Sequence, residues 1–136
     1  MKIDVIHSLF SKSSGISIDT RTIKKKNIFF CLKGQNFNGN LFIDQALSLG
    51  ASSVIYDEEK LNHESEKAIK VKNTLETLQE LAKYHRSKFN IPVIGLTGSN
   101  GKTTSKELFK IVLSKKFSVA CTSNNFNNHI GVPLTI

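Results

Sequence analysis

Residues 93–114 join an apolar run, a glycine-punctuated turn and a helical pattern in direct succession. Val93 to Thr97 has the composition of a strand, and glycines at 98 and 101 follow before apolar residues recur at helical spacing. A strand that leads through such a turn into a helix is typical of phosphate binding, because the glycines let the backbone wrap closely around phosphate oxygens. The positive end of the following helix adds to this attraction. The segment TGSNGKTT, residues 97–104, therefore predicts a phosphate-binding loop.

Two residues of this loop have distinct chemical roles. Lys102 would reach the β- and γ-phosphates of a nucleotide and is the candidate catalytic residue, while the Thr103 hydroxyl would bind Mg²⁺. The strict pattern GxxxxGK[ST] is not met, since Leu96 stands where it requires glycine. The alternative is a glycine-rich turn that only caps the helix. The candidate nucleotide-binding residues are Gly98, Ser99, Asn100, Gly101, Lys102, Thr103 and Thr104.

Strand and helix patterns alternate along most of the chain, which indicates an α/β fold with parallel strands. Five apolar residues in a row at 28–32 predict a strand that is covered on both faces. Asn73, with Glu76 three residues later, resembles a capping box and predicts a helix that ends near Lys88. Residues 34–40 are a loop by composition. Helices are also expected over 3–10, 42–47 and 102–114, the second of them ended by Gly50 as its C-terminal cap. Strands are expected over 16–19, 54–56, 68–71, 93–97 and 117–121.

These patterns divide the chain into a first domain over 1–88 and a second unit over 89–136. In the second unit, Leu108, Ile111 and Val112 are expected to face inward from the helix that follows the phosphate loop. One strand–loop–helix–strand unit cannot cover its own faces. Either something else completes this domain or the sequence is the amino-terminal part of a longer protein, and we expect the latter.

The charge balance limits the classes of partner. Lys and Arg number 19 against 11 Asp and Glu, a net charge of +8, which suits nucleic acid, a membrane surface or anionic small molecules. Only Arg21 and Arg86 are arginine, the usual reader of guanine edges, so sequence-specific DNA binding is disfavoured. A small basic module that binds RNA or another anionic polymer stays open as an alternative.

The expected location is the cytoplasm. No apolar run approaches the roughly 20 residues of a membrane span, and the first residues lack the layout of a signal peptide. Cys31 and Cys121 lie far apart without a CxxC motif, which predicts buried free thiols in a reducing compartment.

Three segments resemble the Mur ligase family, the ATP-dependent amide-forming enzymes of peptidoglycan synthesis. TGSNGKTT is similar to the family's variant phosphate loop. Ser17 to Arg21, followed by NIFFCLKGQNFNGNLFIDQALSLGA, resembles the domain that holds the UDP-sugar, with Thr20 in place of the usual serine. The segment TSNNFNNHIGVPLT, residues 122–135, resembles the member that joins D-alanyl-D-alanine to UDP-N-acetylmuramoyl-tripeptide, with Asn124 where glycine is more common.

The resemblance implies a small α/β UDP-sugar-binding domain over 1–88, followed by the first strand–phosphate loop–helix–strand unit of a parallel-sheet ATPase domain over 89–136. It implies ATP and Mg²⁺ at Gly98–Thr104 and phosphorylation of the peptide carboxylate, whose acyl-phosphate is then attacked by the incoming amine. A sibling ligase that adds a different residue stays open. We expect the parent protein to be the enzyme, and this chain alone to be a monomer without full activity.

The resemblance also suggests where the UDP-sugar binds. Thr20 and Arg21 are candidates with the Asn38-Gly39 turn. The asparagines of the NNFNN segment are expected at the junction where the substrates meet. Of these, Asn125 and Asn128 are candidate UDP-sugar ligands, and Asn124 and Asn127 are expected to shape the junction.

Overall fold

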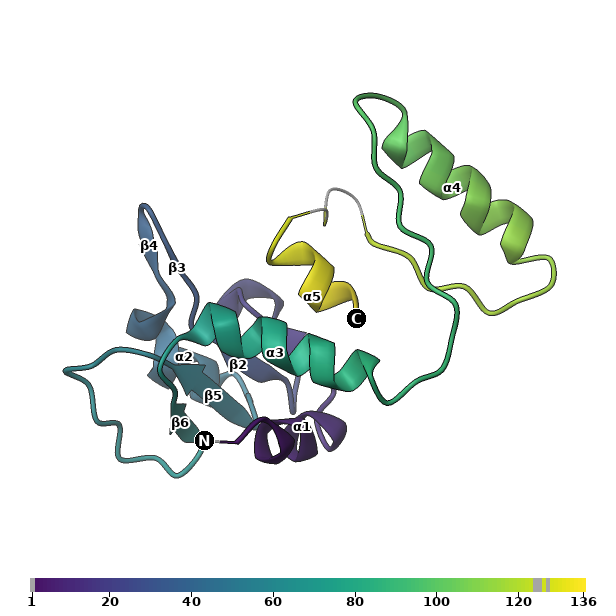
Figure 1. The fold of residues 1–136 in the computed structure, drawn as a ribbon. Helices are drawn as coiled ribbons and strands as arrows, with labels where there is room; N and C mark the ends of the chain where they lie inside the picture. The colour runs from purple at the N-terminus through teal and green to yellow at the C-terminus, as the bar shows by residue number, and fades with distance from the viewer. Residues whose placement is uncertain (1, 124–125, 127) are drawn as a thin grey trace.

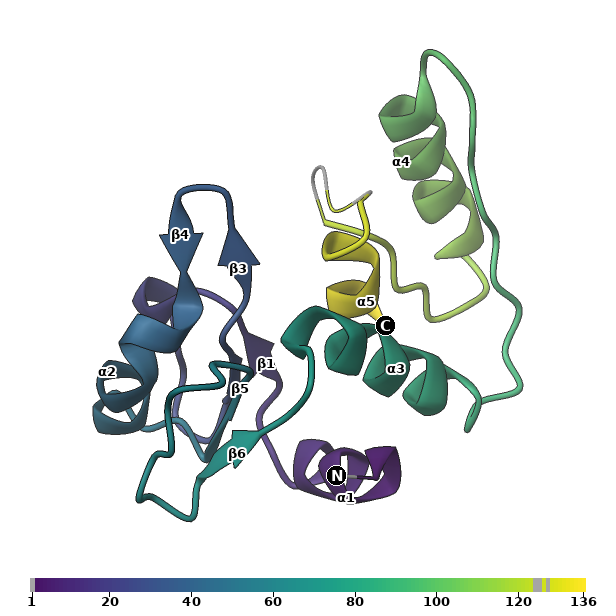
Figure 2. The same cartoon turned by 60° about the vertical axis from the view of Figure 1, so that its left-hand side comes forward.

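The computed structural model describes residues 2–123, 126 and 128–136 (Figure 1). A small sheet with helices around it forms the first part of the chain, and α4 stands away from it on a long arm (Figures 1 and 2). The helices are α1 (Ile3–Ser11), α2 (Ile43–Ser48), α3 (Thr74–Arg86), α4 (Lys102–Leu113) and α5 (Gly131–Thr135), with 3₁₀ turns at Thr20–Thr22 and Gly39–Phe42. The strands are β1 (Ile16–Ser17), β2 (Ile28–Phe30), β3 (Lys33–Gly34), β4 (Phe37–Asn38), β5 (Ser53–Tyr56) and β6 (Ala68–Lys70).

Four short parallel strands form the central sheet in the order β1-β2-β5-β6. In this register Ile28 lies opposite Ile16 on one side and Ser53 on the other. All three residues of β2 are fully buried, as a strand covered on both faces requires. The predicted α/β fold with parallel strands is confirmed.

Helices cover both faces of this sheet. Successive side chains of a strand point to opposite faces. Ile28 and Phe30 accordingly pack in one apolar cluster with Leu78 of α3. A side chain of α1 belongs to the same cluster. Phe29 packs in a second cluster with Ile43 of α2. The sheet is thus the middle layer of three.

Local signals set the ends of two helices. The Asn73 side chain accepts a hydrogen bond from the Glu76 N–H at 3.0 Å, so the predicted start of α3 is confirmed. After α2, Gly50 adopts a left-handed conformation with φ of +95°, and its N–H donates to the Leu47 carbonyl at 3.0 Å. This is the predicted glycine stop of that helix.

The segment at 34–40 differs from the expected loop. Strands β3 and β4 pair antiparallel as a small hairpin, with Lys33 opposite Asn38 and Gly34 opposite Phe37. Each strand is only two residues long, so the sequence offers no alternation of apolar and polar residues that would predict it.

The two strands expected in the second unit do not form in the part of the chain that the structure describes. Residues 93–97 and 118–121 have no regular secondary structure, residue 117 lies in a bend, and Val93 is 68% exposed. A strand is held by hydrogen bonds to a neighbouring strand, and among the described residues neither segment has one. Helix α4 forms as predicted, but the residues expected to face inward are exposed by 58%, 60% and 67%: Leu108, Ile111 and Val112.

Both cysteines are free thiols, as predicted. Cys31 is buried directly after β2, and burial, with a smaller contribution from the charge of Asp57, raises the pKa of its thiol to about 12. Cys121 is only half-buried, so the predicted burial holds for Cys31 and not for Cys121. None of the helices in the described ranges is long and apolar enough to cross a membrane.

A pair of histidines joins α1 to α3. His7 Nε2 and His85 Nδ1 lie 3.0 Å apart, at hydrogen-bond distance, and aromatic rings surround them. The His85 ring packs edge-on against Phe10 and Phe89, and Lys88 lies over the neighbouring Tyr84 ring. Burial and the charge of His7 lower the pKa of His85.

We expect this pair to make stability depend on pH. Because the folded-state pKa of His85 is depressed, its contribution is present above the unfolded value and is lost as the pH falls through the folded one. A protonated imidazole carries N–H donors only, so protonated His85 can no longer accept a hydrogen bond from His7. The melting temperature should stay nearly constant above about pH 7 and fall as the pH drops below about 6.5, the unfolded-state value. This fall should be shallower in His85→Gln but unchanged in His129→Gln. An equal slope in wild type and His85→Gln would contradict the prediction.

Candidate functional site

The loop predicted to bind phosphate leads into the amino-terminal end of α4. Gly101 is left-handed with φ of +75°, and Gly98 has φ of +150°, so both sites favour glycine. The first backbone N–H of α4 to bond back within the helix is that of Ser105, which donates to the Gly101 carbonyl at 2.9 Å. The N–H groups of Lys102, Thr103 and Thr104 therefore have no acceptor inside the helix and suit an anion.

Lys102 holds its ammonium over this loop. Its Nζ donates to the Gly98 carbonyl and, at 3.3 Å, to the Ser99 carbonyl. A cation in the first turn of a helix is disfavoured by the helix dipole unless an anion is close. The residues present therefore fit the phosphates of a nucleotide, with the exposed backbone donors and the ammonium on the same loop.

Mg²⁺ has one candidate ligand from this chain. Thr103 is the second residue of α4, in the position from which its hydroxyl would meet a phosphate-bound ion. Within the described ranges, no group of three or more His, Cys, Asp or Glu side chains could hold a metal ion. The donor set fits a metal that is held mainly by the nucleotide and to a lesser extent by the protein.

The first candidates for the UDP-sugar follow β1. Thr20 and Arg21 lie in the 3₁₀ turn that Asp19 caps, since the Arg21 N–H donates to the Asp19 carboxylate at 2.9 Å. The Arg21 guanidinium also donates to this carboxylate, at 2.6 Å and 3.0 Å, although its side chain is 88% exposed. The side-chain and then the backbone hydrogen bond from Arg21 lower the pKa of Asp19 to about 2. An exposed arginine oriented in this way can meet a phosphate.

The second candidates follow β2. Gly39 lies so close to the end of this strand that a Cβ there would be 2.8 Å from backbone atoms of Cys31 and Leu32. The Gly39 N–H donates to the Leu32 carbonyl at 2.9 Å. Asn38 precedes it, and its side chain accepts from the Asn40 N–H at 3.1 Å. Because the carboxyl ends of parallel strands meet at the same edge, the segments after β1 and β2 lie along one edge of the sheet.

Asn128 takes a structural position at the start of α5. Its side-chain oxygen Oδ1 accepts from the N–H groups of Ile130 and Gly131, at 3.1 Å and 2.7 Å. The next residue, His129, is tied to α3 because its carbonyl accepts from Gln79 Nε2 at 3.0 Å. The other predicted asparagines of this segment lie outside the described residues: Asn124, Asn125 and Asn127.

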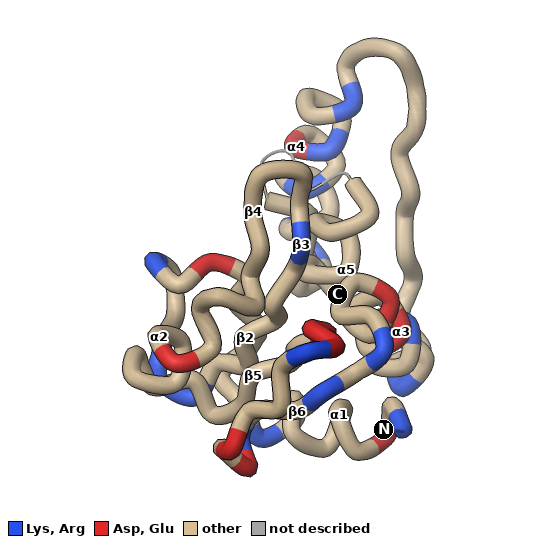
Figure 3. Tube along the Cα trace, turned by 90° about the vertical axis from the view of Figure 1, so that its left-hand side faces the viewer, with Lys and Arg blue, Asp and Glu red and all other residues tan. Residues whose placement is uncertain are grey.

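The candidate residues are brought together only in part. The segments with Thr20, Arg21, Asn38 and Gly39 lie along one edge of the sheet, whereas the phosphate loop is carried on the arm with α4, apart from the sheet in both views (Figures 1 and 2). Lys and Arg are spread over β3, α3 and α4 among acidic residues (Figure 3).

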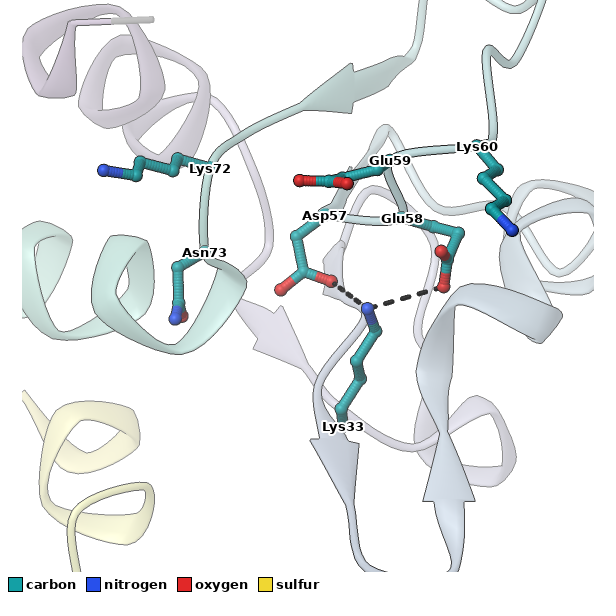
Figure 4. Close-up of a pocket in the computed structure, with 7 residues that line it drawn as sticks. All are labelled: Lys33, Asp57, Glu58, Glu59, Lys60, Lys72 and Asn73. Carbon is teal, nitrogen blue, oxygen red and sulfur yellow. Dashed lines mark ion pairs between the residues drawn. The ribbon is translucent and has the colours of Figure 1, made fainter.

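One polar cluster at this edge was not predicted. An open depression of about 460 Å³ lies where β2 and β5 end and α3 begins (Figure 4). Lys33 pairs there with Asp57 at 3.2 Å and with Glu58 at 3.4 Å. The signal in the sequence was the position of Asp57 directly after a buried strand, where sites of α/β proteins gather. The depression is lined by Lys33, Asp57, Glu58, Glu59, Lys60, Lys72 and Asn73.

Known proteins match the chain along nearly its whole length. A ligase named UDP-N-acetylmuramoyl-tripeptide–D-alanyl-D-alanine ligase, from Bacillus subtilis, is 43% identical over 123 residues, which are 90% of this chain and 27% of that protein. The ligase of the same name from Synechocystis is 44% identical over 125 residues, again 90% of this chain and 27% of the relative. The chain thus spans about a quarter of the length of these curated relatives.

Solved structures agree with these sequence matches. The crystal structure of MurF ligase from Thermotoga maritima in complex with ADP matches with a TM-score of 0.82 and 32% identity, over 99% of this chain and 30% of that one. A crystal structure of MurF from Acinetobacter baumannii matches with a TM-score of 0.80 and 32% identity, over 90% of this chain and 27% of that one.

The family models divide the chain between two matches. Residues 96–136 match the Mur ligase middle domain. Residues 12–86 match the model described as Mur ligase family, catalytic domain. Since this second match alone spans more than half of the 136 residues, the chain belongs to the Mur ligase family.

Proposed function

We propose that this chain supplies the UDP-sugar site and the phosphate loop of an ATP-dependent ligase that joins D-alanyl-D-alanine to UDP-N-acetylmuramoyl-tripeptide. The observation that carries the proposal is the loop before α4, where left-handed Gly101, free helix N–H groups and the Lys102 ammonium converge. The names of the relatives support the substrates, and the ADP complex of the Thermotoga protein supports a nucleotide. We place the two sites in separate domains, over 1–88 and 89–136.

In this proposal the residues of the chain mainly bind and position. Lys102 and the first N–H groups of α4 neutralise the charge of the phosphoryl group as it passes to the peptide carboxylate. Thr103 is the proposed ligand of Mg²⁺, which when bound offsets the charge of the nucleotide phosphates. Holding both substrates in line removes much of the entropic barrier to their reaction. The proposed ligands of the UDP-sugar are Thr20, Arg21, Asn38, Gly39, Asn125 and Asn128.

The binding step can be measured on the chain itself. Calorimetry should detect binding of UDP-N-acetylmuramoyl-tripeptide to the 136-residue chain, and Arg21→Gln should weaken it by about tenfold, since charge-assisted hydrogen bonds to phosphate are lost. Lys24→Gln, on an exposed lysine of the same connection, is the matched control.

With MgATP and D-alanyl-D-alanine added to the UDP-sugar, the isolated chain should release no phosphate. Phosphate release at the rate of a complete ligase would contradict this prediction.

Two further measurements separate the alternatives. Salt-sensitive binding of a generic RNA oligomer, with no response to the UDP-sugar, would favour the basic module in place of the ligase.

For the whole reaction, residues 1–136 can replace the matching stretch of the Bacillus subtilis relative; we call this protein the fusion ligase. We expect the fusion ligase to turn over with D-alanyl-D-alanine. Failure of the 136-residue chain to bind the UDP-sugar would count against the proposal.

A further inference from the structure

A partly buried carboxylate ties the Asn38-Gly39 turn to the rest of the sheet edge. Asp57, whose side chain is 12% exposed, directly follows β5. Its Oδ2 accepts from both the N–H and the hydroxyl of Thr74, each at 3.0 Å. Its Oδ1 accepts from Asn40 Nδ2 and from Lys33 Nζ, each at 3.2 Å (Figure 4). The carboxylate therefore links the start of α3 to the segment after β2.

Asn40 carries this link to Asn38. The Asn40 side-chain oxygen Oδ1 accepts from the Asp57 N–H at 3.1 Å, so these two residues bond to each other in both directions. The Asn40 Nδ2 also donates to the Asn38 side-chain oxygen at 2.8 Å. Asn40 is only 5% exposed, and its amide is oriented by these partners. The orientation of the Asn38 side chain thus depends on Asn40, and that of Asn40 on Asp57.

The charge of Asp57 is suited to this role. Burial favours its neutral form, but hydrogen bonds from Thr74, Asn40 and Lys33 outweigh burial and lower the pKa of Asp57. An ionised carboxylate is an acceptor at both oxygens. Here Oδ1 meets Asn40 Nδ2 and Lys33 Nζ, and Oδ2 meets the Thr74 N–H and the Thr74 hydroxyl, whose single hydrogen is shared with the Cys31 carbonyl. An asparagine at this position would turn an NH₂ group toward one pair of donors, either those of Thr74 or those of Asn40 and Lys33. Only the carboxylate satisfies both.

We propose that Asp57 is a positioning residue for the UDP-sugar: it acts through Asn40 to set the Asn38 side chain and the Gly39 turn. This inference rests on the proposed function, because it assumes that the UDP-sugar contacts this turn. Asp57 itself does not touch the ligand in the proposal. The carboxylate of Asp57 acts only on its neighbourhood, because its effect is transmitted through the side-chain amides of Asn40 and Asn38.

The test compares two substitutions that remove the same charge. Asp57→Asn should weaken the affinity of the chain for UDP-N-acetylmuramoyl-tripeptide by about tenfold in calorimetry, because a charge-assisted link is lost. Glu58→Gln, at the next residue of the same depression, should change this affinity by less than about twofold, since Glu58 contacts Lys33 but is not bonded to Asn40. In ¹H–¹⁵N spectra the amide signals of Asn38 and Gly39 should change position in Asp57→Asn and keep their wild-type positions in Glu58→Gln.

A second variant separates positioning from simple loss of stability. Asn40→Ala removes the link from the other end and leaves the bonds from Thr74 to Asp57 in place, so it should weaken binding by a similar factor. If Asp57 acts through Asn40, the double variant should bind no more weakly than either single one. Additive effects, or equal affinity of wild type and Asp57→Asn, would overturn the inference while leaving the UDP-sugar site intact. If the wild-type chain fails to bind the UDP-sugar, the proposed site fails, and this inference fails with it.

Discussion

Lys102→Ala should lower turnover of the fusion ligase by about 10²–10³-fold, the loss typical when one group that stabilises transition-state charge is removed. Lys102 is the residue of the loop that brings a full positive charge to the phosphates. Among the described residues its ammonium donates hydrogen bonds to the carbonyls of Gly98 and Ser99, and its side chain is exposed. The free energy of unfolding should therefore change by no more than about 0.5 kcal/mol.

The measurement pairs phosphate release with thermal unfolding. Lys110→Ala removes the same side chain from an exposed site in the last turn of the same helix, and it should leave both turnover and melting temperature close to wild type. MgATP binding should weaken in Lys102→Ala and not in Lys110→Ala. A folded Lys102→Ala fusion with normal turnover would mean that the loop only caps α4.

The parts of the fold that were predicted correctly depend on short-range interactions. Asn73 bonds to the N–H three residues later, and Gly50 follows the last turn of α2, so a local pattern is enough to place both ends. The buried strand β2 was predictable, over 28–32 in the sequence and Ile28–Phe30 in the structure, because an apolar run of that length has no exposed face. In contrast, a strand at 93–97 needs a neighbouring strand, and no local pattern can supply one.

The site was predictable to different degrees for the same reason. The phosphate loop is one continuous segment, so its glycines and Lys102 are visible in the sequence. Thr20, Arg21, Asn38 and Gly39 were found through resemblance, because only the parallel pairing of β1 and β2 brings them to one edge. The link from Asp57 to Asn40 spans 17 residues and joins separate loops, so it required the structure.

Gly39→Ala should destabilise the chain by about 2–3 kcal/mol and lower its melting temperature by about 10 °C. The new Cβ would lie 2.8 Å from Cys31 C and Cα and from the Leu32 carbonyl oxygen. These are backbone atoms at the end of β2, which is paired with β1 and β5 on both sides and cannot move without disturbing the sheet. The turn would have to lift instead, and the Gly39 N–H would lose its 2.9 Å hydrogen bond to Leu32.

The same hairpin offers a matched control. At Gly34 an added Cβ would meet only the Phe37 Cβ at 4.0 Å, an ordinary contact, and the backbone there is not left-handed. Gly34→Ala should therefore be neutral or slightly stabilising, since it restricts the unfolded chain. Because Gly39 also lies in the proposed UDP-sugar site, Gly39→Ala should lose UDP-sugar binding even at temperatures where the variant is folded. Equal melting temperatures of the two variants would show that the turn can lift freely from β2. The close packing against β2 would then not explain why residue 39 is a glycine.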